Sequence, residues 1–122
     1  MIRIVHICLA AAALGAGLVA CGSNDDSSVA GGDAARGRQM IVEYGCGTCH
    51  VIPGVRTARG TVGPSLAGFG SRRLIAGELP NTDPNLIRWI VDPPAVEPKT
   101  GMPDMNVPRV AARDIVAFLR TR

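Results

Sequence analysis

An all-α fold with long loops is predicted for this chain of 122 residues. Three segments carry helical signals, and no stretch of any length alternates apolar and polar residues as a strand would. Glycine and proline gather between the helical segments, which is typical of loops. The chain is 47% hydrophobic but only 3% aromatic, which is little for a small self-sufficient core and favours a buried non-protein group.

The first main helix is expected over residues 33–45, with Asp33 as its N-cap and Gly45 near its end. Residues 51–70 are rich in glycine and proline and are expected to form a loop. A short helix is expected over residues 71–77.

The second main helix is expected to begin at Thr82 or Asp83, because Pro84 suits a first helical turn. Pro93 and Pro94 are expected to stop it.

A further loop is predicted over residues 95–106, and the third main helix begins at about Pro108. Four apolar residues of this helix follow the spacing i, i+4, i+7 and i+8, which predicts one buried stripe: Ala111, Ile115, Phe118 and Leu119. Two long loops are unusual in so small a domain, and they make sense if they surround a flat ligand.

The N-terminal segment has the features of an export signal. Residues 1–20 hold Arg3 and then an apolar run that is short for a membrane span. The segment ends in "LVAC", which resembles the lipobox of bacterial lipoproteins, so Cys21 is expected to carry lipid and to become the first mature residue. An ordinary signal peptide with a chance cysteine is the alternative.

The expected domains are therefore a lipoprotein signal peptide over residues 1–20, a flexible tether over 21–32 and a folded domain over 33–122. Removal of the signal leaves 12 of the 13 basic residues against all 10 acidic ones. This near balance gives no support to nucleic-acid binding.

The stretch "GCGTCH" places Cys46, Cys49 and His50 within five positions. A structural zinc site needs four ligands, usually from two separated pairs, and the chain has no second pair. A thioredoxin-like dithiol would follow a strand, and a disulfide here would close too small a loop to stabilise much. The spacing C-x-x-C-H instead indicates attachment of a c-type haem, with two thioethers and an imidazole on the iron.

The second axial position of such a haem decides its chemistry. His50 is the only histidine left after signal removal, so the candidates are methionines. Met40 is expected in the core. Met102 is favoured over Met105 because Gly101 and Pro103 hold an extended loop around it.

Residues 33–122 resemble a class I cytochrome c domain. The matching motifs, in order, are "GCGTCH", "GPSLAGFGSR", "LIRWIVDPP" and "TGMPDM". The resemblance implies a small cytochrome c fold, with three main helices, one short helix and loops wrapping one haem c attached through Cys46 and Cys49. It also implies that the first and last helices cross, with Gly37 and Phe118 at the matching positions.

The resemblance also implies roles for four residues. The Pro64 carbonyl would accept a hydrogen bond from the second nitrogen of His50. Arg72 and Thr100 would bind haem propionates, and Trp89 would pack on the methionine side of the ring. Arg72 as a solvated charge and Trp89 as a core residue are the alternatives.

A haem ligated by His50 and Met102 has no free site for substrate, so the sequence predicts a one-electron carrier rather than an enzyme. The motifs are similar to the cytochrome c domain of haem-copper oxidase subunit II, which implies redox protein partners in a respiratory chain. The carrier is expected outside the cytoplasm, tethered to a membrane by lipid. The alternatives are a haem c enzyme or gas-binding protein with an open sixth site, and a fixed haem subunit of a larger complex.

Overall fold

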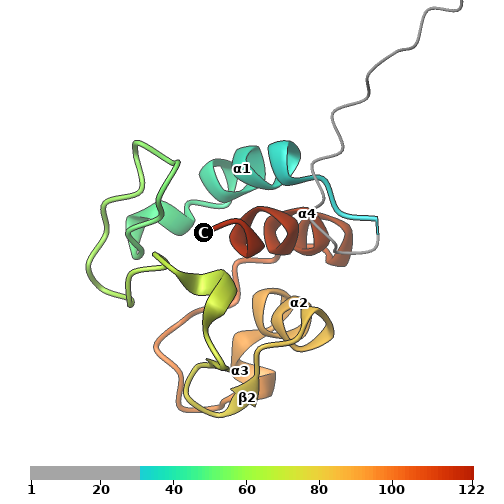
Figure 1. Cartoon of the computed structure of the whole chain (residues 1–122). Coiled ribbons are helices and arrows are strands. Elements are labelled where there is room, and N and C mark those ends of the chain that lie inside the picture. Colours follow the sequence, from blue (N-terminus) through green and yellow to red (C-terminus); the bar gives the residue numbers. More distant parts are fainter. Residues whose placement is uncertain (1–30) are drawn as a thin grey trace, which may run out of the picture.

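The computed structural model describes residues 31–122 (Figure 1). The predicted signal peptide and Cys21 lie outside the described residues, as does most of the predicted tether. Within residues 31–122 the fold is mostly helical, with one two-stranded sheet. No helix of this part is long and apolar enough to cross a membrane.

Helix α1, Ala34–Glu43, forms where the sequence predicts it. The Asp33 carboxylate accepts a hydrogen bond of 3.0 Å from the Arg36 backbone N–H, which is the expected N-cap. Beyond the C-cap Tyr44, Gly45 has a left-handed φ of 67°, a conformation that ends the helix and suits glycine.

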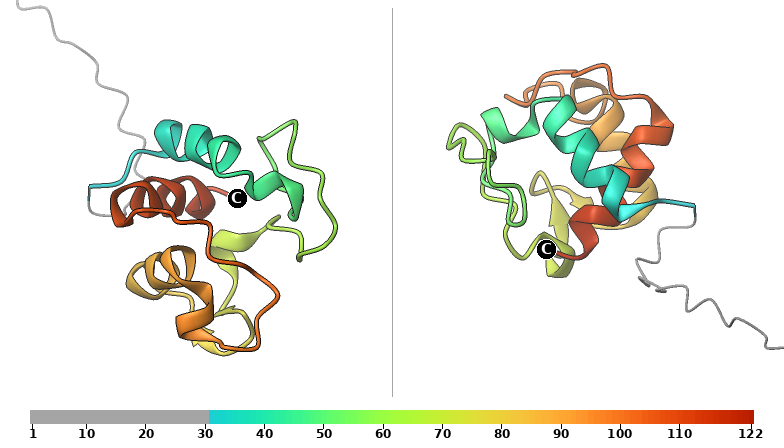
Figure 2. Two further views of the ribbon diagram at one scale, coloured as in Figure 1. Left: turned by 180° about the vertical axis from the view of Figure 1, so that it is seen from behind. Right: turned by 90° about the horizontal axis from the view of Figure 1, so that it is seen from above.

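Helix α4, Arg109–Arg120, follows Pro108. All four predicted stripe residues are buried, which confirms the amphipathic pattern. Helix α1 packs mainly on α4, and α2, Asp83–Val91, packs on α4 as well. Figure 2 shows α1 crossing over α4 when the molecule is seen from above.

The crossing of α1 and α4 depends on Gly37. This residue is buried, and a Cβ there would collide with the backbone of Asp114 and Ile115. The close approach therefore lies against the α4 backbone, one turn before Phe118. The crossing that the resemblance implied is confirmed.

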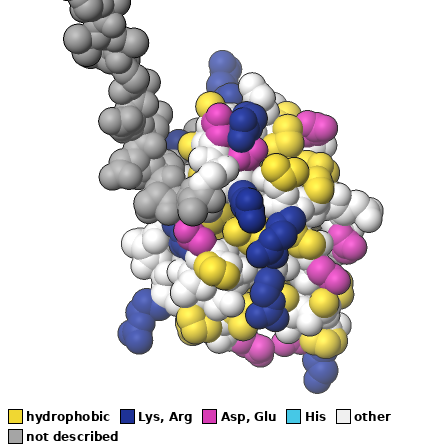
Figure 3. Space-filling view, turned by 90° about the vertical axis from the view of Figure 1, so that its right-hand side faces the viewer, with side chains coloured by type: hydrophobic (Ala, Val, Ile, Leu, Met, Phe, Trp, Pro, Cys, Tyr) yellow, Lys and Arg dark blue, Asp and Glu magenta, His cyan; other side chains and the backbone are white. Residues whose placement is uncertain are grey.

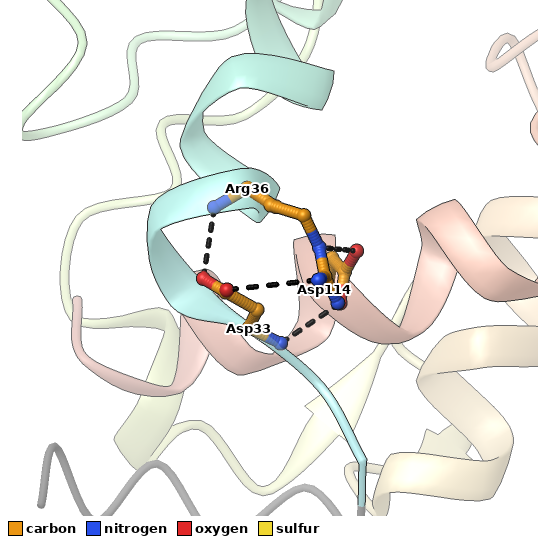
Figure 4. Close-up of polar contacts among 3 residues, drawn as sticks. All are labelled: Asp33, Arg36 and Asp114. Carbon is orange, nitrogen blue, oxygen red and sulfur yellow. Dashed lines mark hydrogen bonds and ion pairs between the residues drawn. The ribbon is translucent and has the colours of Figure 1, made fainter.

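A carboxylate at the same crossing joins the two helices (Figure 4). Asp114 is only 5% exposed, accepts a hydrogen bond of 2.8 Å from the Asp33 N–H, and pairs with the Arg36 Nε at 2.9 Å. The hydrogen bond from Arg36 is the main cause that lowers the pKa of Asp114 below its ordinary value of 3.8. Asp114 thus stays charged while nearly buried.

The short helix predicted over residues 71–77 is wrong. The structure has instead a 3₁₀ turn η2, Phe69–Ser71, and an antiparallel hairpin of β1, Leu74–Ile75, and β2, Leu79–Pro80. Ala76 and Gly77 take left-handed φ values of 52° and 81° at its tip. A helix cannot pass through two left-handed residues, so the chain turns back here.

Helix α2 has Thr82 as its N-cap and ends at Val91, before Pro93, as predicted. The second correction concerns the loop expected over residues 95–106, because Pro93 begins a further short helix, α3, Pro93–Val96. The Asp92 carboxylate caps α3 by accepting a hydrogen bond of 3.0 Å from the Ala95 N–H. Proline suits a first helical turn, because its missing N–H has no partner there.

The surface carries charges of both signs. Figure 3 shows a short line of Lys and Arg side chains on one face, with acidic and apolar side chains beside it.

The loop that follows the cysteine motif is closed by an isolated bridge between Val51 and Arg59.

Candidate functional site

The cysteine motif lies on a tight turn directly after α1. Residues Cys46–Thr48 form the 3₁₀ turn η1, and the N–H groups of Cys49 and His50 both donate to the Cys46 carbonyl, at 3.3 and 3.1 Å. No disulfide joins the two cysteines. Burial raises the pKa of the Cys46 thiol, which favours its neutral form.

A cavity of about 540 Å³ opens beside this turn. Cofactor sites commonly have volumes of roughly 300 to 1,000 Å³. The cavity is lined by 17 residues from four places: the motif, residues 62–77, Trp89 of α2, and the segment 97–103. A smaller pocket of about 60 Å³ shares five of its lining residues with the first: His50, Leu66, Phe69, Trp89 and Met102. The two cavities are therefore neighbouring parts of one apolar region.

The imidazole of His50 is held from behind by the loop that contains Pro64. The Nδ1 atom of His50 lies 2.7 Å from the Pro64 carbonyl oxygen. An imidazole that donates from Nδ1 leaves Nε2 free to bind a metal, and the hydrogen bond raises its basicity. Gly63 packs so closely on the ring that a Cβ there would strike it.

The loop after α3 places Met102 in the same cavity. Met102 is half-buried and lines both cavities, and its N–H donates to the Thr100 Oγ1 at 3.1 Å. Met105 lines only the smaller cavity and is 39% exposed. His50 and Met102 therefore reach the cavity from two separate segments, the turn after α1 and the loop after α3.

The cavity also receives the other residues that the resemblance singled out. Cys49, Pro64, Arg72, Trp89 and Thr100 line the larger cavity, and Cys46 lines the smaller one. Trp89 is half-buried and lines both, so its side chain serves the core and the cavity together.

The hairpin contributes cavity residues that the sequence analysis missed. Leu74, Ala76 and Gly77 line the larger cavity, and Leu74 is 47% exposed. They were missed because a helix was expected over residues 71–77, where the structure has a hairpin. The signal that could have found them is Gly77 at a turn, with Ile75 and Leu79 on either side.

These residues fit a haem c. The site offers two free cysteines, an imidazole whose Nδ1 faces a carbonyl, a thioether and a mostly apolar lining. Histidine with methionine is a common ligand pair of electron-transfer haems.

Comparison with known proteins gives the same result. Residues 34–122 match the cytochrome c family. The chain is 40% identical over 91 residues to cytochrome c oxidase subunit 2 of Alkalihalophilus pseudofirmus, covering 72% of this chain and 25% of that protein. It is 36% identical over 70 residues to the corresponding subunit of Bacillus sp. strain PS3, covering 56% of this chain and 20% of that protein.

The chain thus spans a quarter or less of the length of these relatives. The fold, the cavity and the family match lead to one conclusion: the chain belongs to the cytochrome c family and is an electron-transfer haem protein.

Proposed function

We propose that the chain is a one-electron carrier with one haem c, attached through Cys46 and Cys49 and ligated by His50 and Met102. The observation that carries the proposal is that His50 and Met102 line the same cavity of about 540 Å³, with the Pro64 carbonyl 2.7 Å from the His50 Nδ1. This hydrogen bond orients the imidazole toward the cavity.

The protein's part in the reaction is to hold and tune the ligands. When bound, the haem supplies the one-electron change of its iron, and a thioether ligand favours the reduced state. The Thr100 hydroxyl holds the Met102 backbone, and Pro64 holds His50, so both ligands keep their positions in the two oxidation states. The exposed side chains of Val62 and Leu74 mark the open side of the cavity, where an electron can enter or leave.

The cellular setting is part of the proposal. Cys21 carries lipid and residues 21–32 form the tether, so the carrier works outside the cytoplasm beside a membrane. Its partners are redox proteins of a respiratory chain, with no nucleic acid and no small-molecule substrate. The names of the similar proteins, subunits of cytochrome c oxidase, support an oxidase as electron acceptor.

The absorption spectrum of the purified protein tests the ligands. The oxidised protein should show the weak far-red band of a sulfur ligand on iron, and the reduced protein should not bind carbon monoxide without denaturant. Met102→Ala should lose the band and bind carbon monoxide, whereas Met105→Ala, the matched control, should keep the wild-type spectrum. A wild-type protein without the band would favour the open-site alternative, an enzyme or a gas-binding protein.

The location of the protein tests the anchor. Wild-type protein should partition into membranes, and Cys21→Ser should release it. A Cys21→Ser protein that remains in the membrane with its signal uncleaved would favour a simple helical anchor.

A further inference from the structure

The Arg72 side chain is bound to protein rather than free at the cavity. Its Nη2 donates hydrogen bonds to the carbonyl oxygens of Ser65 and of Ala67, the latter at 3.1 Å. The guanidinium also lies over the Phe69 ring, 5.5 Å from its centroid. Arg72 therefore bridges two carbonyls of one loop from a single nitrogen, while its flat guanidinium packs on Phe69.

That loop is the one that holds the axial histidine. Ser65 follows Pro64 directly, and the Pro64 carbonyl faces the His50 Nδ1. Two backbone hydrogen bonds of 2.8 Å join the loop to the chain around His50, from Gly63 N–H to Cys49 and from Leu66 N–H to Val51. Arg72 holds the loop from its other side.

The backbone of Arg72 is itself fixed to the end of α4. The Asn81 Nδ2 donates to the carbonyls of Phe69 and Arg72, at 3.1 and 3.0 Å. Arg120 donates to the Asn81 Oδ1 at 2.9 Å and to the Asp83 carboxylate at 2.7 Å. Asn81 and Arg120 thus connect the helical core to the loop of Pro64.

We propose that Arg72 is a positioning residue for His50. By bridging the Ser65 and Ala67 carbonyls it keeps the Pro64 carbonyl against the imidazole, and Asn81 keeps Arg72 in place. This inference rests on the proposed function, because it takes His50 as the haem ligand. It differs from the propionate role expected for Arg72, which depends on charge and not on the two carbonyls.

The two roles differ in what a lysine can replace. Lysine keeps the positive charge, but its ammonium nitrogen lies one bond nearer the backbone than the Arg72 Nη2, and it has no flat guanidinium to lie over the Phe69 ring. Arg72→Lys therefore keeps the charge that a propionate role needs and loses the bridge to the two carbonyls.

The experiment measures exchange of the His50 Nδ1 proton by NMR in the reduced, haem-loaded protein. Arg72→Lys and Arg72→Gln should both speed this exchange by about tenfold. This is the change expected when the protection of the Nδ1 proton falls by the contribution of roughly one hydrogen bond. The controls are Arg73→Lys and Arg73→Gln, because the exposed Arg73 side chain has no hydrogen bond or ion pair within residues 31–122.

A wild-type exchange rate in Arg72→Lys would overturn the proposal. An Arg72→Gln protein in which only the pH dependence of the midpoint potential changes would also overturn it, because that result would mean that the Arg72 charge acts on a propionate. A wild-type protein without a haem spectrum would instead contradict the proposed function, and the two failures are therefore distinguishable.

A second variant covers the case in which Arg72 variants fail to fold around haem. Asn81→Ala removes both side-chain donations to the Phe69 and Arg72 carbonyls. It should speed the same exchange in the same direction by a smaller factor. Asn85→Ala is the control, since its amide donates only to Pro80 within the described chain. Equal exchange rates in Asn81→Ala and Asn85→Ala would mean that Asn81 does not keep Arg72 in place, and would overturn the proposal.

Discussion

The crossing of α1 and α4 and the loops around the cavity are held together by different means. At the crossing, backbone packs on backbone at Gly37, and a nearly buried carboxylate ties both helices. Around the cavity, hydrogen bonds between side chains and the loop backbone, such as those of Arg72, Asn81 and Thr100, hold the loops in shape.

The difference separates what the protein stabilises alone from what it builds for its cofactor. The helices of the crossing bury Ile41, Ile115 and Phe118 in the apolar core, and the loop after the cysteine motif adds Ile52 and Val55 to it. The loops also enclose a cavity of about 540 Å³. The side chains that line an empty cavity lack van der Waals contacts on one side, and they gain these contacts when a group fills the cavity.

The strongest test of this comparison removes the haem. In a Cys46→Ser, Cys49→Ser and His50→Ala protein, hydrogen exchange should accelerate at least about tenfold more at the Gly63 and Leu66 amides than at the Gly37 amide. The reason is that the loop amides lose the filled cavity, whereas the Gly37 N–H keeps its bond of 2.8 Å to the Asp33 carbonyl. Equal acceleration at all three amides would show that the crossing also depends on haem.

The next largest effect is expected at the crossing itself. Gly37→Ala should lower the free energy of unfolding by about 3 kcal/mol, because the added methyl group collides with the α4 backbone. Denaturant unfolding of the haem-loaded protein measures it. Gln39→Ala, at an exposed position of the same helix, is the control and should leave stability unchanged. A Gly37→Ala protein as stable as wild type would mean that the helices separate at little cost.

Asp114→Asn should weaken the same crossing by about 2 kcal/mol, since a nearly buried carboxylate loses charged hydrogen bonds. The ion-pair part is limited because the Arg36 side chain is 58% exposed. Glu43→Gln, at an exposed residue of α1 with no ion pair among residues 31–122, should leave stability unchanged.

The pH dependence of this contribution has a definite sign. The pKa of Asp114 is lowered in the folded protein, so the stabilisation is complete above the ordinary value of 3.8 and is lost as the pH falls through the lower folded value. The free energy of unfolding of the wild type should therefore fall more steeply with pH below about pH 4. In Asp114→Asn the same part of the curve should be flatter. Parallel acid curves for the two proteins would contradict the assignment.

The smallest effect is expected in the cavity loops. Thr100→Val should remove the hydrogen bond to the Met102 N–H and lower the free energy of unfolding by about 1 kcal/mol. The far-red sulfur band should weaken, because the loop then holds Met102 less firmly. Thr100→Ser keeps the hydroxyl and should behave as wild type. Identical spectra for the valine and serine variants would indicate that haem binding alone places Met102.

Local sequence signals predicted the three main helices, α1, α2 and α4, and the centre of the site. Asp33, Gly45 and the apolar stripe of α4 act through neighbours within two turns of helix, so their roles can be read from spacing. The C-x-x-C-H motif is equally local, because its three side chains share one turn.

Tertiary structure decided the rest. The spacing on α4 gives no sign that Asp114 is buried, because its partners Asp33 and Arg36 are about 80 positions away, and the hairpin over residues 74–80 depends on two left-handed residues. Likewise the family resemblance implied that Arg72 lies near the cavity, but its partners in the structure are carbonyls. Backbone carbonyls look the same at every residue, so only the folded chain shows which of them a side chain meets.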